Sequence, residues 1–172
     1  TYRKRYERFL GDDFPRVKFP NTLKDMKKIA EMGQKLAQVH LPSERSKQHN
    51  RWVRERNFNM EIPSWKELPQ AEITVTKPKY DPKTQKIWLN KTNWIGSVDK
   101  KTWEFKVGGV QQLKSWLKYR RKSVKGSGKR YGFTRGINPR EYNLFLQIIC
   151  AIEKTYEIQR ELDDLYEEVF RK

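Results

Sequence analysis

The sequence predicts an α+β domain in which helices at both ends surround a small, mainly antiparallel β region. Apolar residues recur at helical spacing before residue 42 and again after residue 109, and between these parts they alternate with polar residues. The 172 residues suffice for one compact core and are too few for two well-buried ones. We therefore expect a single domain over 1–172, with a helical lead-in at 1–42, loops and a β-hairpin at 43–109, and helices joined by a basic loop at 110–172.

The lead-in is predicted to contain two helices. Residues 2–10 carry aromatic side chains at helical spacing, and Gly11 ends this short helix. Asn21 or Thr22 can cap a second helix that runs to about His40. Its predicted buried face consists of Leu23, Met26, Ile29, Ala30, Leu36 and Ala37.

The middle of the chain is predicted to form loops followed by a β-hairpin. Pro42 is expected to stop the preceding helix, and the polar residues 43–70 are expected to form loops and short irregular strands. The stretch "EITVTKPKY" alternates in the manner of a strand, "DPKT" is a turn signal, and "KIWLN" supplies a second strand. Four lysines surround the predicted turn: Lys77, Lys79, Lys83 and Lys86.

Two further helices are predicted after the glycine pair Gly108–Gly109. The first ends near Arg121, and its buried side consists of Val110, Leu113 and Leu117. Residues 122–136 are rich in Gly, Ser and basic residues, which is typical of a loop. The last helix begins with a capping box formed by Asn138 and Glu141 around Pro139. Its predicted apolar stripe consists of Leu144 or Phe145, Ile148, Ile152, Leu162, Tyr166 and Val169.

The charge of the chain is its strongest functional signal. The formal net charge is +17, and the region from Lys100 to Arg135 has twelve basic residues and one acidic residue. From Pro139 onward, acidic residues outnumber basic ones by eight to five. This balance favours a polyanionic partner, with nucleic acid first and an anionic membrane surface second. A generic basic surface is the alternative, and for any single lysine a solvated charge is the simpler interpretation.

Double-stranded DNA is the predicted partner of the basic region. Lys and Arg side chains would neutralise phosphates, while Asn, Gln and Arg side chains can pair with base edges in the major groove. The start of the helix after Gly108–Gly109 could also point free amides at a phosphate. Trp94, Trp103, Phe105 and Trp116 are expected to pack in the core and not to stack on bases. The candidate DNA-binding residues are Lys77, Lys79, Lys83, Lys86, Asn90, Lys91, Asn93, Gln111, Gln112, Lys114, Lys118, Arg120, Arg121, Lys122, Lys125, Lys129, Arg130 and Arg135.

Two alternative functions use the same region. Glu104 and Lys106 have the E-x-K spacing of metal-dependent nucleases, and on a strand they would share one face, with Asp81 or Asp99 as a partner ligand. Because 34% of the residues are charged, this spacing is common by chance. The second alternative is a basic scaffold or RNA-binding module without sequence preference.

Other chemistry finds little support in the sequence. His40 and His49 lack plausible metal or triad partners, so solvated or capping roles are expected. The lone Cys150 lies in an apolar helical pattern and is predicted to be a buried, reduced thiol in a cytoplasmic protein. No apolar run approaches the length of a membrane span, and no phosphate-binding glycine motif is present. No metal site or catalytic residue is expected, so the chain is predicted to bind and not to react.

Four stretches of the chain resemble a known family. They are "YRKRYERFLGDDFPRVKFP", the helix ending in "LAQVHLP", the hairpin "KYDPKTQKIWLNKT", and "WEFKVGGVQQLKSWLKYRRK". In this order they are similar to the C-terminal specificity region of single-polypeptide type ISP restriction-modification enzymes and related adenine-specific DNA methyltransferases. The glycine-rich basic loop at 122–136 departs from the family pattern.

The resemblance implies a target recognition domain cut from a longer protein, and the start on Thr1 without a methionine agrees with a fragment. Separate methyltransferase and, in restriction enzymes, helicase and nuclease domains would act on the DNA. The methyltransferase motif Asn-Pro-Pro-Tyr is missing from this chain. The resemblance therefore implies no cofactor here, S-adenosylmethionine in the parent methyltransferase domain, and that domain as a second partner.

Overall fold

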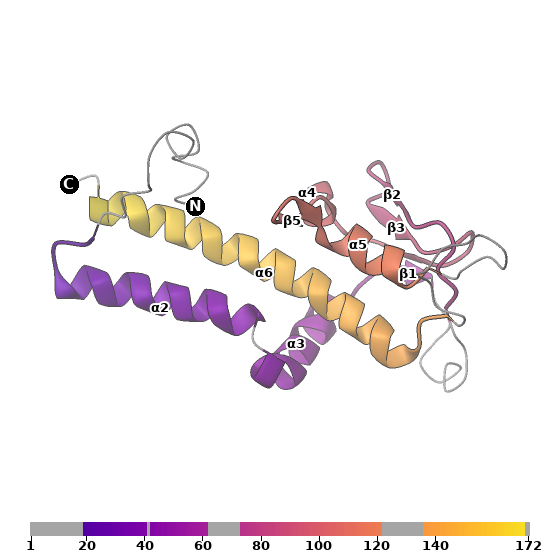
Figure 1. The fold of residues 1–172 in the computed structure, drawn as a ribbon, viewed down its shortest axis with the longest axis horizontal. Helices are drawn as coiled ribbons and strands as arrows, with labels where there is room; N and C mark the ends of the chain where they lie inside the picture. Colours follow the sequence, from indigo (N-terminus) through magenta and orange to yellow (C-terminus); the bar gives the residue numbers. More distant parts are fainter. Residues whose placement is uncertain (1–18, 41, 62–72, 122–135, 171–172) are drawn as a thin grey trace. The chain divides into compact units, whose positions relative to one another are not determined.

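The computed structural model describes residues 19–40, 42–61, 73–121 and 136–170, which Figure 1 draws as ribbon. The predicted helix at 2–10 and most of the basic loop at 122–136 lie outside these residues. The predicted α+β class is confirmed, because helices lie at both ends of the described chain and short antiparallel strands lie between them. The helices are α2 (Leu23–His40), α3 (Pro42–Arg56), α4 (Lys100–Trp103), α5 (Gln112–Tyr119) and α6 (Pro139–Phe170).

The described strands form two small sheets. In the larger sheet, each strand is antiparallel to its neighbour. The strands lie in the order β1 (Met60–Glu61), β4 (Trp94–Ile95), β3 (Lys86–Trp88) and β2 (Lys79–Asp81). The smaller is the hairpin of β5 (Lys106–Val107) and β6 (Val110–Gln111). The predicted turn at 81–84 is confirmed, since Asp81 pairs with Lys86 across it.

The predicted first strand of the hairpin is wrong in its extent. Only the last two residues of "EITVTKPKY", 79 and 80, belong to β2, because Pro78 has no N–H to continue a ladder, and β2 ends at Asp81. Ile73 instead pairs with Ile137, with N···O distances of 3.0 and 2.9 Å, and Val75 bridges to Arg121. Both apolar side chains are buried, so this segment joins the core through partners far away in the sequence.

The prediction of loops after Pro42 is also wrong, because residues 42–56 form helix α3. Proline suits the first position of a helix, where its missing N–H has no intrahelical acceptor, so Pro42 ends α2 and begins α3. The side chains of His49 and Trp52 are buried on this helix, with ring centroids 4.7 Å apart. The expectation that His49 is solvated is therefore wrong as well.

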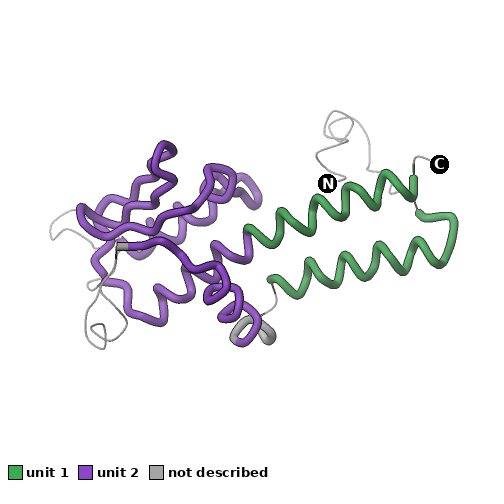
Figure 2. Tube along the Cα trace, turned by 180° about the vertical axis from the view of Figure 1, so that it is seen from behind, with its two compact units in different colours: residues 1–46, 153–172 green, residues 47–152 purple. Residues whose placement is uncertain are grey.

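Cα proximity divides the chain into two compact units, coloured separately in Figure 2. Unit 1 consists of residues 1–46 and 153–172, and unit 2 of residues 47–152. Helix α6 contributes residues to both units. The division of 1–172 into one domain with three parts stays a prediction.

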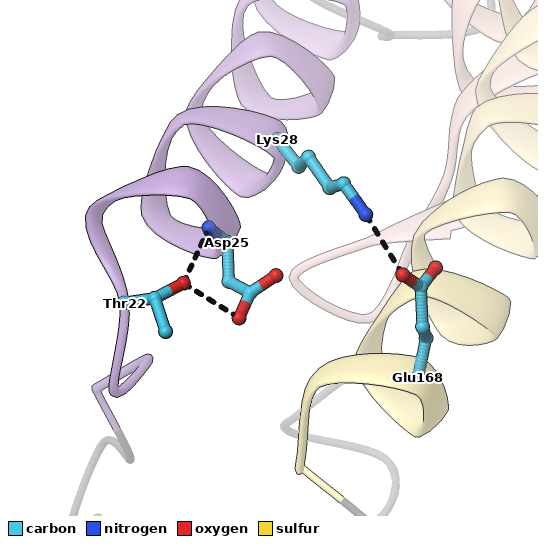
Figure 3. A network of polar contacts seen from close by, with 4 residues as sticks. All are labelled: Thr22, Asp25, Lys28 and Glu168. Atoms are coloured by element: carbon cyan, nitrogen blue, oxygen red, sulfur yellow. Dashed lines mark hydrogen bonds and ion pairs between the residues drawn. The ribbon is translucent and has the colours of Figure 1, made fainter.

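Unit 1 contains α2 and the last turns of α6, which run antiparallel. The Lys28 ammonium donates to the Glu168 carboxylate at 2.7 Å (Figure 3). Nε2 of His40 lies 3.2 Å from Oγ1 of Thr155, so the two contacts follow opposite orders along α2 and α6. The ion pair with Glu168 raises the pKa of Lys28. Thr22 caps α2 as predicted, since its hydroxyl accepts a hydrogen bond from the Asp25 N–H at 3.1 Å.

The predicted buried face of α2 is wrong by part of a turn. Leu23 is 68% exposed and Met26 44%, and Ala30 and Ala37 are exposed too, whereas Met32 and Val39 are buried. Ile29 and Leu36 are half-buried and lie three residues before Met32 and Val39. The buried face of α2 therefore consists of Ile29, Met32, Leu36 and Val39.

Unit 2 contains the fully buried core. Its largest fully buried side chains come from the sheet, from α3, α5 and the first half of α6, and from the segments next to them: His49, Ile87, Leu89, Ile95, Leu113, Leu117, Ile137, Tyr142, Phe145, Leu146 and Ile149. The predicted capping box is confirmed, with both Asn138–Glu141 hydrogen bonds at 2.9 Å. In the predicted α6 stripe, Phe145 and not Leu144 is buried, and Ile149 is buried where Ile148 was expected. Cys150 is buried, as predicted.

Candidate nucleic-acid interface

All the described candidate DNA-binding residues lie in unit 2, between Lys77 and Arg121. Lys122, Lys125, Lys129, Arg130 and Arg135 lie outside the described residues. Of the seven candidate lysines that the structure describes, six are exposed: Lys77, Lys79, Lys83, Lys91, Lys114 and Lys118. Unit 2 has 23 basic and 8 acidic residues, whereas unit 1 has 15 and 13, so nearly all the excess positive charge belongs to unit 2.

The tip of the β2–β3 hairpin is held by Asp81. Its carboxylate accepts hydrogen bonds from the Thr84 hydroxyl at 2.7 Å and from the Lys83 N–H at 3.0 Å. These bonds, that of Thr84 first, lower the pKa of Asp81. Such an Asx-type turn fixes the backbone that carries the exposed side chain of Lys83.

Lys86 differs from its neighbours because it packs on aromatic rings. Trp88 and Trp94 are paired across β3 and β4, so they share one face of the sheet. The Lys86 ammonium lies 3.5 Å from the ring centroid of Trp94 and 6.0 Å from that of Trp88. This cation–π contact holds Lys86 against the sheet.

Asn90 and Asn93 shape the loop between β3 and β4. The Asn90 amide donates to the carbonyl of Thr74 at 2.9 Å and to the Asn93 side chain at 2.8 Å. Its carbonyl oxygen accepts from the backbone N–H groups of Thr92 and Asn93. Both side chains thus have structural bonds in this state, and their contact with bases stays a prediction.

The glycine pair forms the turn of a hairpin and does not directly precede a helix, although the sequence predicts one there. Gly108 and Gly109, with φ of 56° and 81°, form the two-residue turn between β5 and β6, and α5 begins only at Gln112. Val110 is therefore a strand residue and is 50% exposed, so its predicted burial is wrong, whereas Leu113 and Leu117 are buried as predicted. The Gln112 N–H donates to Phe105 O at 3.0 Å, so this amide at the start of α5 already has an acceptor.

The glutamines beside this turn keep an acceptor available. The Gln111 amide donates to Trp103 O at 2.7 Å, and the Gln112 amide donates to Val110 O at 3.0 Å. The side-chain carbonyl oxygens of Gln111 and Gln112 accept no hydrogen bond from the residues that the structure describes. Both groups could therefore accept from a base amine without losing these contacts.

Helix α5 presents lysines to solvent and aromatic side chains to the core. Trp116 stacks on Phe145 of α6, with ring centroids 4.8 Å apart. Trp103 is buried, as predicted, and stacks on Tyr80 at 5.5 Å, while Trp94, Phe105 and Trp116 are half-buried. The aromatic side chains thus position α5, and the exposed Lys114 and Lys118 project from it.

The structure does not have the geometry that the nuclease alternative requires, so the prediction that Glu104 and Lys106 share a strand is wrong. Glu104 caps the C-terminus of α4, and Lys106 begins β5, so the two residues do not share a strand. Asp99 caps the start of α4 instead, accepting from the Thr102 N–H at 2.7 Å. Glu104 lies 3.8 Å from Lys100 in an exposed ion pair. Within 19–40, 42–61, 73–121 and 136–170, no three acidic, His or Cys side chains are grouped to hold a metal ion.

Helix α3 adds basic residues that the prediction of a loop overlooked. Lys47, Arg51 and Arg54 are exposed and lie at i, i+4 and i+7, a spacing that is visible in the sequence once a helix is assumed. Arg51 pairs with Glu55 at 3.4 Å. Asn50 on the same helix accepts from Asn143 at 2.8 Å and from Gln147 at 2.7 Å, which fixes α3 to α6 within unit 2.

A basic α+β unit with a small sheet and exposed lysines is typical of nucleic-acid-binding modules. A comparison with protein families shows that the family model of the Type ISP C-terminal specificity domain matches residues 1–143. The chain therefore belongs to this family. The predicted resemblance is thereby confirmed. No curated protein matches the chain in a sequence comparison. None of the described helices combines the length and apolar character that a membrane span requires.

Two solved structures share the fold. One is a nuclease-deletion mutant of the Type ISP restriction-modification enzyme LlaGI in complex with a DNA substrate mimic, with 24% identity and a TM-score of 0.52. The other is the ATP-dependent Type ISP restriction-modification enzyme LlaBIII bound to DNA, with 22% identity and a TM-score of 0.55. The matches cover 93% and 94% of this chain but only 12% and 10% of the two enzymes. The chain therefore corresponds to a small part of each enzyme.

Proposed function

We propose that the chain is the target recognition domain of a restriction-modification enzyme or DNA methyltransferase and that it reads a sequence in double-stranded DNA. The observation that carries this proposal is the concentration of positive charge in unit 2 of a Type ISP specificity domain. Because specificity domains select a target for other domains, a binding role without catalysis suits this family.

Phosphate neutralisation is assigned to the exposed lysines. Lys79 and Lys83 on the β2–β3 hairpin and Lys114 and Lys118 on α5 have long, exposed side chains that can follow a DNA backbone. Lys47 and Arg54 on α3 are further exposed basic residues of unit 2. Gln111 and Gln112, with their available carbonyl oxygens, are the best placed of the candidate base-reading amides.

The activities of the whole protein belong to parts outside this chain. A parent methyltransferase domain would bind S-adenosylmethionine and methylate adenine, and it would be the second partner of the chain. A parent with restriction activity would add helicase and nuclease domains. A cytoplasmic location remains the expectation for such a protein.

Competition binding tests the proposed class of partner. A fluorescently labelled random-sequence duplex is bound to the chain and then displaced with unlabelled duplex DNA, single-stranded DNA or RNA, and anisotropy is measured. We expect duplex DNA to compete best. With six or more phosphate contacts, affinity should fall by roughly a thousandfold between about 50 and about 200 mM salt. Equal competition by RNA would instead support the non-specific basic module.

A matched pair of double variants locates the surface. Lys114→Ala/Lys118→Ala removes two exposed lysines from α5, and Lys24→Ala/Lys27→Ala removes two exposed lysines from α2 in unit 1. The first variant should weaken binding to every duplex about tenfold, because it loses contacts to phosphates and every duplex has the same phosphate backbone. The second should bind as the unmodified chain does, and an equal loss in both would contradict the assignment to unit 2.

A further inference from the structure

The tip of the β5–β6 hairpin exposes two apolar side chains. Val107 is 57% exposed and Val110 is 50% exposed, and they face each other as a cross-strand pair on one side of the hairpin. A Cβ atom added at Gly108 or Gly109 would meet nothing within 4 Å. The valine pair therefore stands beside open space.

The base of this hairpin is fixed to the core of unit 2. The side chain of Gln111 on β6 donates to Trp103 O, and the Gln112 N–H at the start of α5 donates to Phe105 O, so the end of the hairpin is joined to the segment that precedes it. Trp103 is only 8% exposed, and Leu113, which follows Gln112 on α5, is fully buried. A two-residue turn with positive φ at both positions matches the twist of the strands. The hairpin is thus a short, preorganised projection.

Exposed lysines lie on the hairpin and on the two helices next to it. Lys100 and Lys101 on α4, Lys106 on β5 and Lys114 on α5 are exposed, and α5 contacts both α4 and β6. The nearby acid, Glu104, lies beside Lys100. An apolar tip on a part of the chain with exposed lysines in the neighbouring elements complements a partner that has both anionic and apolar groups. The major groove of DNA is such a surface, because phosphates border it and thymine methyl groups lie within it.

We infer that Val107 and Val110 contact thymine C5-methyl groups in the major groove of the target DNA. This inference rests on the proposed function. The major groove admits a two-stranded β ribbon, and the minor groove is about half as wide. Side chains that wedge between base steps are usually larger than valine. Strand formation alone does not require valine at an exposed tip, since threonine also favours strands and is better solvated.

Removal of single methyl groups from the DNA tests the inference. The chain is used to select its preferred duplex from a random pool, and each thymine of that duplex is replaced in turn by uracil, which keeps the hydrogen-bonding edge but lacks the methyl group. We expect the Kd to rise about fourfold at one or two positions, the worth of one buried methyl group. In Val107→Ala/Val110→Ala and in Val107→Ser/Val110→Ser, neither of which keeps a γ-methyl group, binding to the thymine duplex should weaken and the response to uracil should disappear.

Leu23→Ala, which shortens an exposed aliphatic side chain on α2, serves as the control and should keep the full response to uracil. A preferred duplex without thymine would overturn the inference while leaving the proposed function intact. So would a preferred duplex whose binding is unaffected by uracil, or valine variants that still respond to uracil. If no duplex is preferred, the proposed function fails and the inference fails with it.

Discussion

Arg120 and Arg121 are neighbours in the sequence whose side chains have different surroundings. The Arg120 guanidinium lies 3.8 Å from the ring centroid of Trp116, and its Nε is 3.9 Å from Glu141. Only 23% of this side chain is exposed, and burial lowers the pKa of its guanidinium. Arg121 is exposed. Of the two candidate DNA-binding residues, Arg120 thus has the clearer structural role.

Replacement of each arginine by alanine should separate these roles. Arg120→Ala removes a cation–π contact and a partly buried ion pair, and we expect it to lower the free energy of unfolding by about 1–2 kcal/mol in urea denaturation. Arg121→Ala should leave that free energy unchanged and weaken duplex binding. Equal stability of the two variants would show that the packing of Arg120 contributes little.

Single residues were predictable where their partners are close in the sequence. The bonds of Asn138 with Glu141 span three residues, and the spacing alone reveals them. The amide of Asn90 instead donates to Thr74, and Arg120 lies against Glu141. These partners depend on how distant segments meet, so the same residue types were predicted to contact DNA and turn out to have contacts within the fold.

At the scale of elements, the turn of the β2–β3 hairpin should respond to acid. Hydrogen bonds from Thr84 and from the Lys83 N–H lower the pKa of Asp81 in the folded state. The stabilisation is then complete above the unfolded pKa of about 3.9 and is lost as pH falls through the lower folded value. Asp81→Asn should therefore melt below the unmodified chain at pH 7, and the difference in Tm should shrink between about pH 4 and about pH 2.5.

Thermal melts of both proteins across this pH range measure the effect. Asp164→Asn, which neutralises an exposed carboxylate on α6, is the control for a lost surface charge. A difference in Tm that is the same at pH 7 and at pH 2.5 would show that the ionised form of Asp81 does not stabilise the turn.

Elements with local signals were predicted correctly, and elements defined by distant pairing were not. The turn signal "DPKT" and the apolar spacing of Leu113 and Leu117 suffice to place β2–β3 and α5. The sequence does not predict helix α3, because Pro42 is typical of a helix end and because the helix buries few apolar side chains. The pairing of Ile73 with Ile137 depends on tertiary structure, which no local pattern specifies.

For the whole molecule, the distribution of charge separates two tasks. Unit 1 has 15 basic and 13 acidic residues, and its Lys28–Glu168 pair joins α2 to α6. Unit 2, with 23 basic and 8 acidic residues, has the charge that a polyanion would contact. We therefore expect unit 2 to account for DNA affinity. Composition predicted a polyanionic partner, whereas the division into units requires the structure.

Sequence preference is the most direct test of the account. Repeated selection of a random duplex pool by the chain, followed by Kd measurements at one salt concentration, compares the favoured duplex with a shuffled duplex of the same composition. The account predicts an enriched sequence that binds at least about a hundredfold more tightly than the shuffled duplex. A pool that stays random, or equal Kd values for the two duplexes, would contradict the claim that this domain recognises a DNA target.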